Sequence, residues 1–202
     1  MNVYFLSTKD KTFNSYQIYK AWLSTQYNVH IKSLHSNRGG EYLGEEFSNH
    51  LKKAGMTRKL TVHDTSEHNG VAEHLNWTIL EKVWAMLHES DLPKFLWAEA
   101  VMHAVYLKNQ TWTCTLDNTT PYEILNGQKP NIANLQPWGC KVQVHDTGGT
   151  KLDGHSKIGC WMGLISKLKT YIGFTGWKRD QSLWKEALNS ILKMRLRSQS
   201  YH

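Results

Sequence analysis

Two polar residues of this chain, Asn37 and Glu73, stand at the ends of predicted elements, where side chains that carry chemistry often lie. Asn37 follows an alternating run that predicts a strand, Glu73 lies in the first turn of a predicted helix, and 35 residues separate them. Chemistry at the end of a strand usually requires a carboxylate, whereas Asn37 supplies one neutral carbonyl oxygen. Taken locally, Asn before Arg-Gly-Gly is typical of a turn, and the helix dipole favours Glu in a first helical turn.

The elements that position these residues are predicted from the spacing of apolar side chains. Strands are expected at residues 2–7, 29–36, 58–62 and 138–145. Helices are expected at residues 13–26, 44–54, 71–90, 92–108 and 121–127. Asp91 is expected to cap the helix at 92–108, with Pro93 in its first turn. Residues 63–70 are expected to form a polar loop in which Asn69 and Gly70 precede the helix of Glu73.

Composition favours a globular protein of a reducing compartment. Apolar residues make up 40% of the chain and charged residues 20%, which is typical of a folded domain. The sequence contains no run of 18 apolar residues, so it predicts no membrane span. The first residues do not follow a signal-peptide pattern. The cysteines, Cys114, Cys140 and Cys160, are odd in number and widely spaced, which argues against a disulfide framework. We therefore expect a nuclear or cytoplasmic protein that is not secreted.

The net charge of +7 is concentrated at one end of the chain. Residues 1–163 contain 16 Lys and Arg against 15 Asp and Glu, a net charge of +1. Residues 164–202 contain 8 against 2, a net charge of +6. A basic segment binds polyanions whatever its origin, so this charge alone is weak evidence of function. Arginine is also scarce, with five residues against nine Trp.

Several longer motifs point to a known family. The chain resembles the catalytic core of retroviral-type integrases, in the version carried by copia-type LTR retrotransposons, over about residues 1–163. That family has the pattern S-D-x-G-G-E-Y, and after 35 residues a Glu in P-x-x-N-G-x-x-E-R. The matching segments here are SNRGGEY, HNGVAE, LPKFLWAEAVMHAVYLKN, TPYEILNGQKPNIANLQPWGC and KLDGHSKIG.

The resemblance implies an α/β, RNase H-like fold and two-metal phosphoryl transfer, in which three carboxylates hold two Mg²⁺ ions. Glu73 matches the third of these ligands, and Asn37 stands where the family has the second, an Asp. The first would lie on a strand upstream of Asn2, so we expect a truncated core without its first two strands. Mg²⁺ binding is therefore expected to be weak or lost, and catalysis absent.

The resemblance also implies a surface for DNA, and possibly RNA, along the helix that carries Glu73. The family forms homo-oligomers, and no membrane partner is expected. His74, Trp77 and Trp84 stand where the family or related elements carry Arg, and Trp cannot replace the charge of Arg. The residues implied in nucleic-acid binding are Asn69, Gly70, His74, Trp77, Lys82 and Trp84.

The departures from the family pattern share a direction. Asp to Asn at position 37, Pro to Ser at 66, and Arg to His or Trp at 74, 77 and 84 each follow from one transition mutation. Our hypothesis is a retrotransposon copy altered by directional transition mutation. A zinc site at His63, His68 and His74 is the alternative for these histidines, but without a Cys pair they are better interpreted as surface residues.

Three segments are expected. Residues 1–128 would form the truncated integrase core, and residues 129–163 a linker and part of an SH3-like domain. The resemblance is expected to stop at Gly163, so residues 164–202 would form a basic tail, produced by a frameshift or genuine. Three functions remain open: an active integrase, a non-catalytic nucleic-acid-binding remnant, and a product without a selected role.

Overall fold

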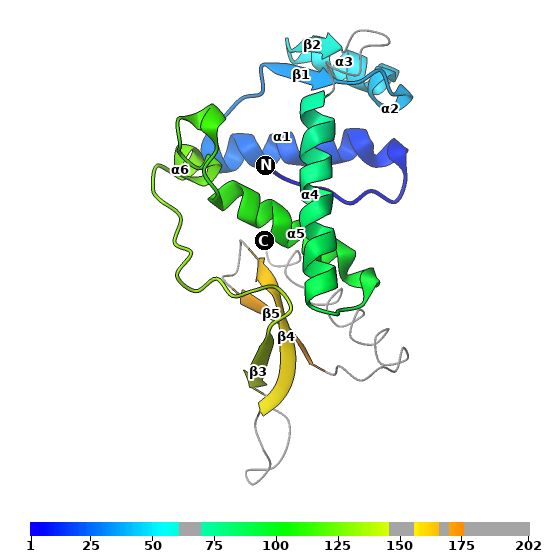
Figure 1. Cartoon of the computed structure of the whole chain (residues 1–202). Coiled ribbons are helices and arrows are strands. Elements are labelled where there is room, and N and C mark those ends of the chain that lie inside the picture. The colour runs from blue at the N-terminus through cyan, green and yellow to red at the C-terminus, as the bar shows by residue number, and fades with distance from the viewer. Residues whose placement is uncertain (61–69, 146–155, 166–169, 176–202) are drawn as a thin grey trace. The chain divides into compact units, whose positions relative to one another are not determined.

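The computed structural model describes residues 1–60, 70–145, 156–165 and 170–175. Contacts divide the chain into two compact units, residues 1–82 with 107–130, and residues 83–106 with 131–202. Helices and strands occur together in the chain, which confirms the predicted α/β class (Figure 1). The predicted segment limits at residues 128 and 163 stay predictions. The loop at 63–69, with His63, His68 and Asn69, lies outside the described residues.

The first unit packs around Phe47, whose side chain is 1% exposed. Helix α1 (Thr12–Tyr27) confirms the helix predicted at 13–26, and α3 (Glu45–Lys53) carries Phe47. The rings of Phe13 and Tyr16 on α1 lie with their centroids 4.8 and 5.4 Å from that of Phe47. A third ring, Tyr42, approaches it to 5.7 Å. This aromatic cluster joins α1 to α3 and to the segment that follows Asn37.

Strands β1 (Ser33–Ser36) and β2 (Thr57–Leu60) of the first unit pair in parallel, with Ser33 opposite Thr57 and Ser36 opposite Leu60. The strands expected at residues 29–36 and 58–62 are therefore both present and pair with each other, each over four residues only. A strand extends only as far as its partner supplies hydrogen bonds, and β2 has four residues. The short helix α2 (Gly40–Leu43), directly after the Asn37 turn, was not predicted.

The strand predicted at residues 2–7 is wrong, because this segment has no regular secondary structure. Its apolar side chains remain partly exposed, with Tyr4 at 41%, Phe5 at 40% and Leu6 at 41%. A run of β-forming residues becomes a strand only when another strand pairs with it. None of the described strands pairs with these residues.

Helix α4 (Gly70–Glu89) agrees with the helix predicted at 71–90, and Ile79 and Val83 are each only 5% exposed. The helix predicted at 92–108 begins later: a 3-10 turn, η3 (Lys94–Leu96), precedes α5 (Trp97–Gln110). Asp91 does not cap it, because its φ of 51° places it in the left-handed turn after α4. Among the described helices, none has the length and apolar character needed to cross a membrane.

Short elements complete the first unit. The 3-10 turns η1 (Lys9–Lys11) and η4 (Cys114–Leu116) precede α1 and α6 respectively. Helix α6 (Pro121–Asn126) confirms the helix predicted at 121–127. The Thr120 hydroxyl accepts a hydrogen bond from the Glu123 amide, and Gly127 ends the helix with a φ of 70°. Its sequence thus contains both its start and its stop.

The second unit contains an antiparallel sheet in the order β3-β4-β5 (Figure 1). Strands β3 (Lys141–His145) and β4 (Ser156–Ile165) are followed by β5 (Thr170–Thr175). Trp161 of β4 is 1% exposed, and the ring of His103 on α5 meets it edge to face at 5.0 Å. Burial lowers the pKa of His103 to about 4. Strand β4 continues through Gly163 and pairs with β5 on both sides of this residue.

Gly139, which precedes β3, lies closer to its neighbours than any larger residue could. Its φ is +82°, and an added Cβ would lie 2.3 Å from the Cβ of Ser90. Gly127 offers a matched control, with a φ of +70° and nothing within 4 Å of an added Cβ. We expect Gly139→Ala to lower the free energy of unfolding by about 3 kcal/mol, from backbone strain and steric overlap together.

Urea unfolding of both variants measures this difference. Gly127→Ala carries the backbone strain alone and should cost about 1 kcal/mol. Equal losses for the two variants would show that the Ser90 contact has no energetic consequence.

Candidate functional site

Asn37 lies in the turn directly after β1, and its side chain is exposed. The Gly39 amide donates a hydrogen bond to Asn37 Oδ1 over 3.0 Å. Asn37 therefore uses one lone pair of its only side-chain acceptor to close the turn that leads into α2. An Asp at this position could close the same turn and still offer a second, negatively charged oxygen. The local geometry agrees with the turn interpretation and leaves Asn37 one neutral acceptor position.

Arg58 on β2 holds the chain around this turn, a role that sequence reasoning missed. Its guanidinium donates to the carbonyl oxygen of Tyr42 and to Ser48 Oγ, the latter over 3.3 Å. Arg58 thereby connects β2 to α2 through Tyr42 and to α3 through Ser48. It is one of only two arginines before residue 164. Because Nη1 and Nη2 of Arg58 bind acceptors of the protein itself, Arg58 contributes to the fold at this position.

Glu73 lies in the first turn of α4 and its side chain is exposed. Four residues that follow on the same face of this helix, at three- and four-residue spacing, are also exposed. They are Trp77, Leu80, Trp84 and His88. Trp77 is 68% and Trp84 70% exposed, an unusual exposure for such large apolar side chains.

The other residues predicted on this helix differ in setting. His74 is exposed, and Thr78 Oγ1 lies 3.3 Å from its Nδ1. Lys82 is half-buried, and Gly70 is the first residue of α4. The roles of these residues in nucleic-acid binding stay predictions.

The described residues do not fit the magnesium site that the resemblance implies. Among them, no group of three or more His, Cys, Asp or Glu side chains is placed to hold a metal ion. Asn37 and Glu73 both belong to the first unit, and their shared metal position stays a prediction. Two Mg²⁺ ions need several anionic oxygens, and this pair of side chains contributes one carboxylate.

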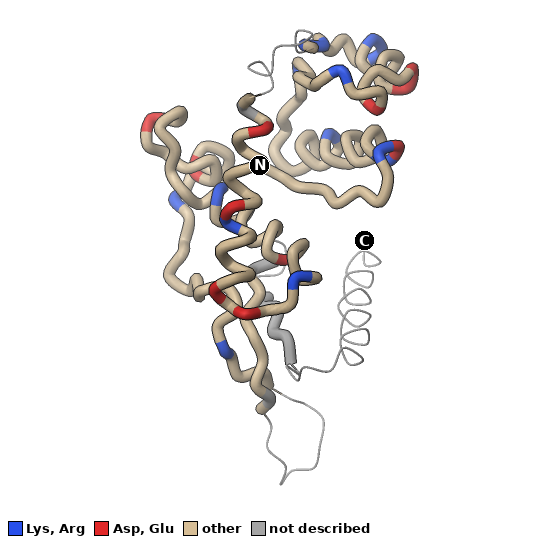
Figure 2. Tube along the Cα trace, turned by 45° about the vertical axis from the view of Figure 1, so that its right-hand side comes forward, with Lys and Arg blue, Asp and Glu red and all other residues tan. Residues whose placement is uncertain are grey.

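Charge in the described residues does not form a strip of one sign. Figure 2 shows lysines and arginines interspersed with carboxylates along the described trace. This agrees with the net charge of +1 over residues 1–163, from 16 basic and 15 acidic residues. Such a surface gives little electrostatic attraction for nucleic acid.

Comparison with known proteins found sequence relatives, although no family model matches the chain. The retrovirus-related Pol polyprotein from transposon TNT 1-94 of Nicotiana tabacum is 33% identical over 195 residues, which is 96% of this chain and 14% of the polyprotein. The corresponding polyprotein from transposon RE2 of Arabidopsis thaliana is 28% identical over 172 residues, 84% of this chain and 12% of its own length. This chain thus spans 12–14% of the length of these relatives.

Among solved structures, the catalytic core domain of HTLV-2 integrase in complex with magnesium aligns with 59% of this chain and 70% of its own. The TM-score is 0.43 and the sequence identity 17%.

The chain combines helices and strands in an α/β fold, and its motifs around positions 37 and 73 resemble those of integrase catalytic cores. The sequence relatives name the group more closely. This chain belongs with the retrovirus-related Pol polyproteins of copia-type transposons, as a homologue of one segment of them.

One expectation about the tail is corrected by these relatives. The TNT 1-94 match covers 96% of the chain, so it extends well beyond Gly163. The expectation that the resemblance stops at Gly163 is therefore wrong for this relative. The short motifs used for the resemblance end at residue 159, so sequence reasoning had no motif to follow beyond it.

Proposed function

We propose that this chain is an integrase-related segment that does not join DNA and that binds nucleic acid mainly through residues 164–202. Asn37 carries the first half of the proposal, because a neutral amide replaces a metal-binding carboxylate. The Asn at position 37 would impair the metal site equally in any longer protein that contains this segment.

The second half rests on charge. The eight Lys and Arg of residues 164–202 face only two carboxylates in the same segment, whereas the rest of the chain is nearly balanced. Basic residues in excess attract phosphates by releasing counterions. The exposed Trp77 and Trp84 offer flat rings on which an unpaired base could stack, a contact that does not depend on sequence.

The partners proposed for the chain follow from the same family membership. They are nucleic acid, either DNA or RNA, and further copies of an integrase segment. A nuclear or cytoplasmic location is also a proposal, supported by Cys114, Cys140 and Cys160, which are all free thiols. The remaining hypothesis is that the chain is a copy altered by directional transition mutations and has no selected role. This hypothesis predicts no measurable activity of any kind.

Restoring the carboxylate tests the role of position 37. We expect Asn37→Asp to raise the affinity for Mn²⁺ about fivefold, because one added negative charge near a cation contributes about 1 kcal/mol even at an exposed site. The turn should persist, since Asp accepts the Gly39 amide as Asn does. Binding is measured by the loss of the free Mn²⁺ signal in electron paramagnetic resonance.

The control is the double variant Asn37→Asp with Glu73→Gln. If the two positions share a metal, the gain disappears in the double variant. A gain that survives Glu73→Gln would show that the two side chains do not meet, and no gain at all would remove position 37 from the metal site.

A further inference from the structure

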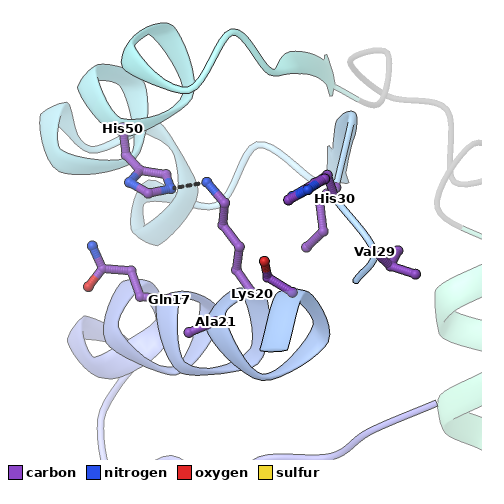
Figure 3. A pocket seen from close by; sticks show the side chains of 8 residues that line it. Gln17, Lys20, Ala21, Val29, His30 and His50 are labelled. Atoms are coloured by element: carbon purple, nitrogen blue, oxygen red, sulfur yellow. Dashed lines mark hydrogen bonds between the residues drawn. The ribbon is translucent and has the colours of Figure 1, made fainter. Parts of the chain in front are cut away.

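A shallow basin lies in the first unit, away from the two positions assigned to metal binding. It has a volume of about 360 Å³ and is formed by α1, by residues 29–31 and by α3. Figure 3 shows Lys20 extending from α1 toward His50 on α3. Its eight lining residues are Gln17, Lys20, Ala21, Ser24, Val29, His30, Ile31 and His50.

The contact between Lys20 and His50 fixes the state of the imidazole. Lys20 Nζ lies 3.2 Å from His50 Nε2. An ammonium group can only donate, so Nε2 accepts and the ring is neutral, with its proton on Nδ1. The rings of Phe13 and Tyr16 meet the imidazole edge to face at 5.5 and 5.9 Å and hold its orientation.

The basin has positive charge without a lining carboxylate, since none of its eight residues is acidic. Burial, and then the charges of Lys20 and Lys53, lower the pKa of His50. Two basic side chains in contact are stable here only because one is neutral. An anion between them would compensate Lys20 and allow His50 to take up a proton.

The other lining groups indicate the kind of anion. Gln17, Ser24 and His30 can donate hydrogen bonds to oxygen, while Ala21, Val29 and Ile31 form an apolar wall. The volume equals that of about twelve water molecules at about 30 Å³ each. It therefore has room for an organic group attached to the anion.

We propose that this basin binds the phosphate group of a nucleotide, with Lys20 and a protonated His50 as its two charged contacts. The nucleotide can be free or can be the phosphorylated end of a nucleic-acid strand. The site uses neither Asn37 nor Glu73, so it goes beyond the proposed function and stands independently of it.

Binding should depend on pH in a defined direction. The anion raises the pKa of His50 above that of the free chain, so binding takes up a proton. Affinity therefore rises as pH falls through the raised pKa, and levels off below the pKa of the free chain. The groups facing His50 are Lys20 and Tyr16 on α1 and Lys53 on its own helix, with His30 across the basin. Sulfate, which does not titrate in this range, separates the contribution of His50 from that of phosphate, whose second pKa is about 6.

Nuclear magnetic resonance of the histidines in the full chain provides the test. Adenosine monophosphate, inorganic sulfate and a 5′-phosphorylated dinucleotide are titrated separately, with adenosine as the unphosphorylated comparison. We expect the phosphorylated probes to shift the His50 signals and to raise its pKa, and adenosine to leave both unchanged. Binding of the mononucleotide identifies a free nucleotide as sufficient, and binding of the dinucleotide alone identifies a strand end.

Matched variants locate the site. Lys20→Gln should weaken binding about fivefold, as expected for loss of one partly exposed charge, while Lys20→Arg should retain it. Lys129→Gln removes the same charge from an exposed residue outside the basin and should have no effect. Unchanged binding in Lys20→Gln, equal loss in Lys129→Gln, or equal binding of adenosine would each overturn the proposal.

Discussion

Incubated with Mg²⁺ or Mn²⁺ and a labelled DNA end, this chain should give neither 3′-processing nor strand transfer above background. Two-metal phosphoryl transfer requires ligands that neutralise both cations while they hold the attacking and leaving oxygens. Asn37 has one neutral acceptor, and one lone pair of that oxygen already binds the Gly39 amide. Each 1.36 kcal/mol of lost transition-state stabilisation costs a factor of ten in rate. Loss of a metal ligand therefore leaves joining undetectable.

The measurement is a gel assay of labelled DNA products, with an active integrase as the positive control. The informative comparison is with Glu73→Gln. Metal-dependent joining by the unaltered chain that disappears in Glu73→Gln would refute the prediction and would make Glu73 a catalytic residue. A signal of equal size in both proteins would identify a contaminating nuclease, because it would not depend on the proposed site.

The elements that were predicted well from the sequence are those whose own residues determine where they begin, end or pack. Helix α6 is bounded by Thr120 and Gly127, and α4 has an apolar stripe that includes Ile79 and Val83. The elements that failed depend on other parts of the chain. Residues 2–7 have the composition of a strand, but pairing decides whether a strand forms. Asp91 has the right residue type for a helix cap, yet the preceding turn gives it a φ of 51°.

The candidate site divides in the same way. Positions 37 and 73 were found because the family motif fixes their neighbours and their spacing, and the structure places each in the expected turn or helix. Lys20 and His50 are in contact although they lie 30 residues apart in the sequence, so no local sequence pattern predicts this contact. The hydrogen bonds of Arg58 to Tyr42 and Ser48 likewise follow from the packing of β2 against neighbouring segments. Such contacts appear only when the chain is folded.

The tail needs a test that leaves the sheet intact. Deletion of residues 164–202 would remove β5, which pairs with β4, so loss of binding could then reflect loss of the fold. Replacement of every Lys and Arg in this segment by Gln retains the chain length. The positions are Lys167, Lys169, Lys178, Arg179, Lys185, Lys193, Arg195 and Arg197.

The matched control removes the same number of charges from the rest of the chain. It replaces exposed lysines whose side chains lie in the described residues. The positions are Lys9, Lys11, Lys32, Lys52, Lys53, Lys59, Lys94 and Lys129.

Neutralising the tail should weaken DNA binding on the order of a thousandfold at about 50 mM salt, as expected when most phosphate contacts are lost. The slope of log affinity against log salt should decrease by about 0.9 for each contact removed. The control should lose much less, because residues 1–163 contain 15 Asp and Glu that already repel phosphates, against two in the tail. Fluorescence anisotropy over a range of salt concentrations measures both quantities. Equal losses in the two variants would mean that net charge alone governs binding, and a larger loss in the control would place the nucleic-acid site in residues 1–163.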